Sequence, residues 1–175
     1  MVLSTDAAVE GIHFRFDWLD DHAIGRRGAR AALSDLAAMG AQPVGLTLSL
    51  TLPRAWPDAR FEALVRGVAT AGATLGAPLL GGNLTTAPVL SATFSVFGEV
   101  PAGTAITRSG AQPDDGLWVS GPLGRTALGL AALQQDMDGG ALIEAWRAPP
   151  CRIDAGLALR GHATASDHLL EAVQR

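Results

Sequence analysis

The sequence lacks the features that would place it in a membrane, on a nucleic acid or among disulfide-bonded proteins. Its single cysteine, Cys151, cannot form an internal disulfide, which is consistent with a reducing cytoplasm. The formal net charge is −4 and no basic stripe is present, so we expect no nucleic-acid partner. No run approaches the roughly 18 apolar residues of a membrane-spanning helix, and the opening residues lack a signal-peptide pattern. The composition therefore predicts a cytoplasmic protein without a membrane partner.

What the chain does have is enough apolar residues to fill a core. Hydrophobic residues make up 48% of its 175 residues, and the mean hydropathy is +0.23. These values exclude an extensively disordered chain and predict one globular domain, or one domain and part of another.

Strand and helix patterns alternate through the first hundred residues. Hydrophobic spacing predicts strands at 1–5, 43–53, 77–83 and 89–100, and helices at 20–41 and 57–76. Asp20 or Asp21 is the expected N-cap of the first helix, and Gly40 its expected end. In the strand at 43–53, alternate residues from Val44 to Leu52 should share one buried face. This order predicts an α+β fold, in α/β layers.

After Pro101 the pattern changes. Residues 116–124 resemble a strand followed by a glycine turn, and helices are expected at 125–135, 139–150, 152–162 and 165–175. The strands that would cover these helices are not evident. We therefore predict an N-terminal domain over 1–112 and a partial second domain over 113–175.

Two acids stand out, each with an ordinary alternative. Asp6 lies just past the end of the predicted first strand, where loops often carry functional groups, although it could equally be a turn-forming residue. Asp35 falls in the last turns of a helix, at the negative end of the helix dipole, on a stripe of small residues. Such a carboxylate needs a cation or hydrogen-bond donors; the alternative is a solvated acid paired with an arginine.

Other candidates are weaker alone. Gly81, Gly82 and Asn83 would let a ligand approach the backbone, or would form an ordinary turn. Arg108 could hold a phosphate or lie on the surface. His13 lies between Ile12 and Phe14 and could be a satisfied, partly buried histidine.

Several motifs occur together in the order of a known family. The stretches STDAAVEGIHF, SDLAAMGAQPVGLTLSLTLP, LLGGNLTT, FGEVP, TRSGAQPDDGLWVSGPLG and ALGL resemble bacterial thiamine-monophosphate kinases, from about Val2 to Leu130. Those enzymes belong to the superfamily of aminoimidazole ribonucleotide synthetase. The resemblance implies the N-terminal domain fold of that superfamily, with a mixed sheet packed on helices, and the start of a second α+β domain.

The resemblance also implies an activity and a site. The activity would be ATP-dependent phosphorylation of thiamine monophosphate, with several Mg²⁺ ions, by in-line phosphoryl transfer in a homodimer. His13 would contact the substrate. Residues implied at the nucleotide are Gly82, Asn83, Arg108 and Ser166, and residues implied at the metals are Ser4, Thr5, Asp6, Asp35, Asn83 and Asp167.

The sequence also departs from the family pattern. Asn83 stands where the family has an acid in Gly-Gly-Asp, and Thr164 stands where it has the first acid of Asp-x-Ser-Asp-Gly. An upstream Gly-Asp-Asp motif and most of the second domain are not in the chain, so we expect it to be shortened at both ends. Two alternatives therefore stay open: a non-catalytic, dimerising nucleotide-binding domain, and another ATP-dependent enzyme of the superfamily.

Overall fold

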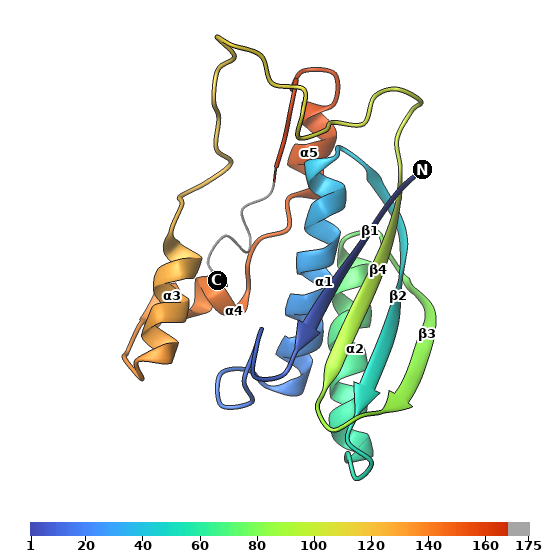
Figure 1. Ribbon diagram of the computed structural model, residues 1–175, viewed down its shortest axis with the longest axis vertical. Coiled ribbons are helices and arrows are strands. Elements are labelled where there is room, and N and C mark those ends of the chain that lie inside the picture. Colours follow the sequence, from blue (N-terminus) through green and yellow to red (C-terminus); the bar gives the residue numbers. More distant parts are fainter. Residues whose placement is uncertain (168–175) are drawn as a thin grey trace.

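The computed structural model describes residues 1–167, of which the first hundred form a mixed sheet covered on one face by two helices (Figure 1). The elements are β1 (Val2–Val9), α1 (Asp21–Ala38), β2 (Gln42–Leu52), α2 (Asp58–Thr74), β3 (Leu79–Thr86) and β4 (Ser91–Glu99). In the order β1-β4-β2-β3, β4 runs antiparallel to both of its neighbours, whereas β2 and β3 are parallel. The predicted α+β fold with a mixed sheet is confirmed.

The ends of α1 follow the predicted signals. Asp20 is the N-cap, and its Oδ1 accepts a hydrogen bond of 2.7 Å from the Ala23 amide. At the other end Gly40 has a φ of +63°, and the Ala41 amide donates to the Leu36 carbonyl at 2.8 Å. Together these caps define the ends of α1, the helix that lies along β1.

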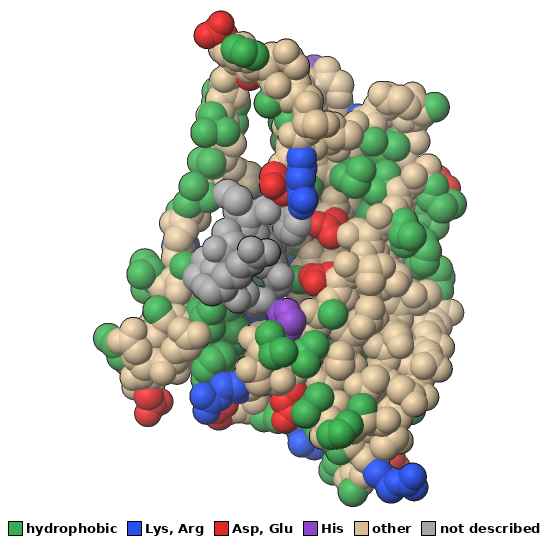
Figure 2. Space-filling model, viewed as in Figure 1, with side chains coloured by type: hydrophobic (Ala, Val, Ile, Leu, Met, Phe, Trp, Pro, Cys, Tyr) green, Lys and Arg blue, Asp and Glu red, His purple; other side chains and the backbone are tan. Residues whose placement is uncertain are grey.

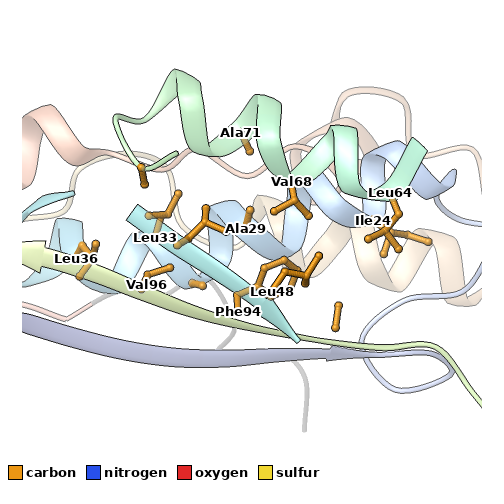
Figure 3. Packing of buried hydrophobic residues seen from close by; sticks show 14 of the residues in the cluster. Ile24, Ala29, Leu33, Leu36, Leu48, Leu64, Val68, Ala71, Phe94 and Val96 are labelled. Carbon is orange, nitrogen blue, oxygen red and sulfur yellow. The ribbon is translucent and has the colours of Figure 1, made fainter. Parts of the chain in front are cut away.

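The core lies between the sheet and the two helices (Figure 3). Fully buried side chains come from α1 (Leu33), α2 (Leu64, Val68) and β4 (Phe94). The helices approach each other closely, since a Cβ on Gly67 would lie 2.0 Å from the His22 carbonyl oxygen. This contact fixes α1, and with it every α1 residue of the candidate site.

Two strand predictions need correction. β1 does not end at Thr5 but continues to Val9, so Asp6 lies within a strand that pairs with β4. In β2 the register shifts between Pro43 and Gly45, which turns Val44 to the open face, where it is 46% exposed. A bulge adds one residue to the strand and so reverses which side chains face the core before it. The buried face is therefore as predicted from Leu46 onward, whereas the prediction that Val44 is buried is wrong.

The ordinary turn considered at Gly81 and Gly82 does not form, because β3 runs through both glycines and past the predicted end at residue 83 to Thr86. Gly82 pairs with Leu48 of β2, and a Cβ on Gly82 would lie 1.8 Å from the Leu48 carbonyl oxygen. The requirement for glycine there comes from the neighbouring strand.

The second unit contains α3 (Arg125–Gln134), α4 (Gly140–Arg147) and α5 (Ile153–Leu159), as predicted. Residues 116–124 are not a strand; Leu117 and Trp118 are 95% and 91% exposed. A strand needs a hydrogen-bonded neighbour, and among residues 1–167 none lies beside this segment. The last predicted helix, 165–175, falls mostly outside the described residues, and 165–167 are not helical.

The second unit contacts the first through α5 and α4. Gly156 of α5 would place a Cβ 1.9 Å from the Ala37 carbonyl oxygen, and the Arg160 Nε donates to the Gly40 carbonyl at 2.8 Å. Trp146 of α4 packs edge-on against Trp18. The boundary near residue 112 stays a prediction. In the part of the chain that the structure describes, no helix is both long and apolar enough to cross a membrane.

Candidate functional site

The candidate site begins where β1 lies along α1. In β1, Val2 is buried and Ser4 and Asp6 are half-buried, so these alternate residues face α1, whereas Thr5 points to the opposite face. There the Thr5 hydroxyl lies 3.3 Å from the Ser95 hydroxyl. Ser4, Thr5 and Asp6 were all expected at the metals. β1 points the side chains of Ser4 and Asp6 toward α1 and that of Thr5 away from it.

Asp35 has the hydrogen-bond donor that its position at the end of α1 requires. The Ser4 hydroxyl donates to Asp35 Oδ2. A carboxylate here faces the carbonyl end of the helix dipole, so a donor from β1 offsets part of the unfavourable interaction. The structure thus brings two predicted metal-site residues, 31 positions apart, into direct contact.

Asp6 and His13 share a small cavity next to this contact. Its volume is about 20 Å³, and its lining includes both side chains together with Phe14, Arg27 and Phe94. Asp6 Oδ1 accepts a hydrogen bond of 2.7 Å from the Ala7 amide. Both residues are half-buried, so the cavity has polar groups on its outer side and aromatic rings farther in.

The orientation of His13 follows from a tight turn after β1. The Val9 amide donates to His13 Nδ1 at 3.1 Å, and the His13 amide donates to the Val9 carbonyl at 2.9 Å. Because Nδ1 accepts a proton donor, the neutral ring carries its hydrogen on Nε2. His13 thus offers an Nε2–H donor. Glu10, by contrast, is structural, and its Oε2 accepts from the Leu90 amide at 3.0 Å.

Arg60 of α2 anchors the loop that carries His13. The Arg60 guanidinium makes two hydrogen bonds of 2.8 Å to the Asp21 carboxylate. It lies 4.0 Å from the ring centroid of Trp56 and 4.5 Å from the ring centroid of Phe16. The hydrogen bonds to Asp21 raise the pKa of Arg60 above its ordinary value. A cation between two aromatic rings and a carboxylate fixes the end of the loop.

A second group of predicted residues meets elsewhere in the chain. The Arg108 Nε donates to Asp167 Oδ1 at 2.9 Å, and the Ser166 amide donates to the Thr107 carbonyl at 3.2 Å. The structure therefore joins a predicted nucleotide-binding arginine to a predicted metal ligand, 59 positions apart. Figure 2 shows a basic side chain, acidic side chains and a histidine following one another along the face over β1 and α1.

Thr164, which the resemblance implies in place of an acid, has a defined partner. Its hydroxyl donates to Asp115 Oδ2 at 2.7 Å, and the Gln112 amide donates to the same oxygen at 2.9 Å. These hydrogen bonds, that of Thr164 first, lower the pKa of the exposed Asp115. Thr164 thus binds a carboxylate in place of supplying one.

Gly82 and Asn83 are not brought to Asp6 and Asp35. They lie on β3, at one edge of the sheet, and β1 lies at the other. Three strand spacings, roughly 14 Å, separate the edges. Asn83 and Asp35 therefore cannot bind one metal ion within a single chain.

Sequence reasoning missed Arg27. It is 6% exposed, it lines the cavity with Asp6 and His13, and its guanidinium lies 4.6 Å from the ring centroid of Trp146. The signal was available, because Arg27 is eight positions before Asp35 and so lies on the same side of α1. Among residues 1–167, no three His, Cys, Asp or Glu side chains are grouped as a metal site.

The chain resembles known proteins in sequence and structure. Residues 1–100 match the family described as AIR synthase related protein, N-terminal domain. The chain is 39% identical over 185 residues to thiamine-monophosphate kinase of Salmonella typhimurium, covering 99% of this chain and 54% of the relative. It therefore spans about half the length of the curated relatives it matches.

Two solved structures agree with the sequence comparison. The thiamine-monophosphate kinase of Stenotrophomonas maltophilia K279a superposes with a TM-score of 0.86 at 34% identity, over 94% of this chain and 54% of that one. AaThiL complexed with AMPPCP and TMP has a TM-score of 0.86 at 28% identity, over 93% and 53%. The chain therefore belongs to the family of AIR synthase related proteins and contains that family's N-terminal domain.

Proposed function

We propose that this chain is part of a kinase that transfers the γ-phosphoryl group of ATP to thiamine monophosphate, in the cytoplasm. The observation that carries the proposal is the contact of Ser4 with Asp35 where β1 lies along α1, with Asp6 and His13 sharing a cavity between the same two elements. The likeness to AaThiL, whose structure contains AMPPCP and TMP, supports the choice of substrates. A phosphate oxygen of the acceptor would attack the γ-phosphorus in line, and ADP would leave.

The residues present fit Mg²⁺ as the metal. Mg²⁺ at kinase sites is held by one or two carboxylates together with phosphate oxygens and water, so the absence of a three-acid group from residues 1–167 is compatible with it. Asp35 and Asp6, with the Ser4 hydroxyl, would hold the ion. The Thr5 side chain faces away from α1 and Asp167 is paired with Arg108, so these two residues would bind the ion only through other atoms or after a rearrangement. When bound, Mg²⁺ supplies positive charge beside the transferred phosphoryl group.

The chain's own side chains would position the two substrates. His13 would donate from Nε2 to the acceptor phosphate, since its Nδ1 is already bonded to the Val9 amide. Arg108 and Ser166 would contact the nucleotide, with the Arg108–Asp167 ion pair as the arrangement before binding. Positioning and neutralisation of charge account for most catalysis of phosphoryl transfer, so these residues need form no covalent intermediate.

A homodimer explains the place of Gly82 and Asn83. They occupy the sheet edge opposite Asp35, and the face of the sheet away from α1 and α2 is open, with Leu3 62% and Val44 46% exposed on it. Pairing of two sheets through these open faces would let β3 of one chain approach β1 of the other. Asn83 would then meet nucleotide and metal at the partner's site.

The test is calorimetric titration of the chain with AMPPCP, with and without Mg²⁺. Binding that depends on Mg²⁺, is lost in Asp35→Asn and is kept in Asp58→Asn is the expected result. Asp58 is an exposed carboxylate in the first turn of α2 and serves as the matched control. Mg²⁺-dependent binding that survives Asp35→Asn would contradict the proposed site. Formation of thiamine diphosphate from thiamine monophosphate would then test the reaction itself.

A second candidate is a non-catalytic, dimerising nucleotide-binding domain. Two observations favour it: an amide replaces an acid at position 83, and Thr164 is bonded to Asp115. Fewer acids give weaker metal binding, and the loss of one such charge can cost a few kcal/mol in the transition state. Binding of AMPPCP without any thiamine diphosphate formation would select this candidate.

A further inference from the structure

Arg27 is a buried cation in the middle of α1, beside the predicted substrate residue. Only 6% of it is exposed, and its side chain lines the cavity that Asp6 and His13 also line. An arginine buried so deeply is held by specific interactions, one of which is its contact with the Trp146 ring. Its charge lies beside the cavity that the half-buried Asp6 and His13 also line.

Trp146 fixes the position of this cation from the second unit. The Arg27 guanidinium lies 4.6 Å from the Trp146 ring centroid, and the Trp146 ring packs edge-on against Trp18 at 5.7 Å. The Arg147 Nε donates to the Trp18 carbonyl at 3.0 Å, which ties α4 to the same loop. A contact with a ring engages the face of a guanidinium, whereas its N–H groups lie in its plane, so an arginine can contact a ring and donate hydrogen bonds at the same time.

Arg27 and Asp35 give α1 different chemistry at two points along the helix. Arg27, Ala31 and Asp35 are each four residues apart and so share one side of the helix, with small Ala31 between the charged pair. Eight residues of helix span roughly 12 Å. Asp35, in the last turn of α1, contacts Ser4, whereas Arg27, in the middle of the helix, shares a cavity with His13.

We propose that Arg27 and His13 form the subsite for the phosphate group of the acceptor, a phosphate monoester, with Trp146 as the residue that positions Arg27. Arg27 would bind the phosphate through charge-assisted hydrogen bonds, and His13 would donate from Nε2. Asp6 adds negative charge to the same cavity, and the arginine offsets it. The cavity holds about one water molecule, so a single oxygen of the phosphate would enter it in place of that water, from the side of Asp6 and His13, while the rest of the ligand stays outside.

This subsite rests on the proposed kinase function for the identity of its ligand, but its test is separate. Arg27→Gln and the control Arg26→Gln are titrated by calorimetry with thiamine monophosphate and with thiamine, which has no phosphate. Arg26 is the adjacent arginine of α1 and does not line the cavity. Arg27→Gln should weaken binding of thiamine monophosphate by about 10- to 100-fold. Its binding of thiamine should stay within about twofold of the wild type.

Two further measurements test the subsite if Arg27→Gln does not fold. Arg27→Lys keeps the charge but loses the planar fork, and should retain part of the preference for the monophosphate. In the wild type, thiamine monophosphate should change the tryptophan emission more than thiamine does, and Trp146→Phe should remove that difference. A structural role alone would shift the melting temperature of these variants without altering the preference for the phosphate.

Equal loss of both ligands in Arg27→Gln, or unchanged binding of the monophosphate, would overturn the subsite. The kinase proposal is judged by a different ligand, because it fails when Mg²⁺-dependent binding of AMPPCP is absent. A chain that binds thiamine monophosphate through Arg27 but not AMPPCP would keep the subsite and lose the kinase.

Discussion

The Ser4 hydroxyl and the Asp35 carboxylate meet side chain to side chain, although 31 positions separate them in the sequence. Ser4 faces α1 because β1 alternates, and Asp35 faces β1 because α1 is held by its caps and by its close contact with α2. The site thus depends on the packing of one strand on one helix. Removing either side chain tests that dependence directly.

Ser4→Ala should destabilise the metal-free chain by about 1 kcal/mol, because Asp35 loses a donor at the carbonyl end of α1. Urea denaturation of Ser4→Ala, Asp35→Asn and the double variant measures the coupling between the two side chains. Thr5→Ala is the matched control, since Thr5 is the next residue of the strand and faces away from α1. Fully additive effects of Ser4→Ala and Asp35→Asn would contradict the contact.

Gly67→Ala should destabilise the chain, although alanine is the better helix former by about 1 kcal/mol. A Cβ there would lie 2.0 Å from the backbone oxygen of His22, so α1 and α2 must separate, at a cost of about 1–3 kcal/mol. Thermal unfolding followed by circular dichroism measures the change. As a control for helix propensity, Ala73→Gly on the exposed side of α2 should lower the free energy of unfolding only by the difference in helix propensity between alanine and glycine. A stabilising Gly67→Ala would show that the helices are farther apart.

Elements of the fold could be predicted from the sequence where the local sequence pattern and the tertiary structure agree. Alternation from Leu46 to Leu52 predicted β2, and Asp20 and Gly40 marked the ends of α1. Asp35 could be singled out because a carboxylate at a helix C-terminus needs a partner. Its partner Ser4 could be expected only from the resemblance, since nothing local relates residues so far apart.

The wrong or missed predictions have one physical source: the spacing of residues along the sequence does not determine which distant segments contact each other. Val44 faces outward because a bulge shifts its register against β4, and Gly82 lies in a strand because β2 runs beside it. Arg27 was missed for a related reason: its value as a site residue depends on Trp146, more than a hundred residues later. In each case a distant segment decides what the local residue does.

Cys151 should react slowly with thiol reagents. Burial raises the pKa of its thiol to about 11, although Cys151 lines an open cleft of about 580 Å³. Two pH units correspond to about 100-fold less thiolate, so alkylation at pH 8 should be about 100-fold slower than in urea. Quantitative labelling with iodoacetamide at several pH values measures this. Equal rates in the folded and unfolded chain would show that the thiol is not buried.

The same burial predicts a pH dependence of stability. The folded pKa of Cys151 lies above the ordinary value of 9.0, so only the unfolded chain ionises its thiol between pH 9 and about 11. The stability that the neutral buried thiol contributes is therefore fully present below pH 9 and is lost as the pH rises toward 11. Urea denaturation of the wild type and Cys151→Ser across this range isolates the contribution, which should be visible only as a steeper fall in the wild type.

The extended segment around Trp118 should make the chain self-associate. Leu117 and Trp118 are 95% and 91% exposed, and contiguous apolar surface of this kind promotes association. In analytical ultracentrifugation, Leu117→Ser combined with Trp118→Ser should reduce oligomers larger than a dimer, whereas Leu128→Ser on the nearby α3 should not. A dimer formed through the open face of the sheet would survive both changes, because that face contains neither residue. A wild-type chain that stays monomeric at high concentration would contradict both forms of association, and with them the proposal that Asn83 acts at a partner's site.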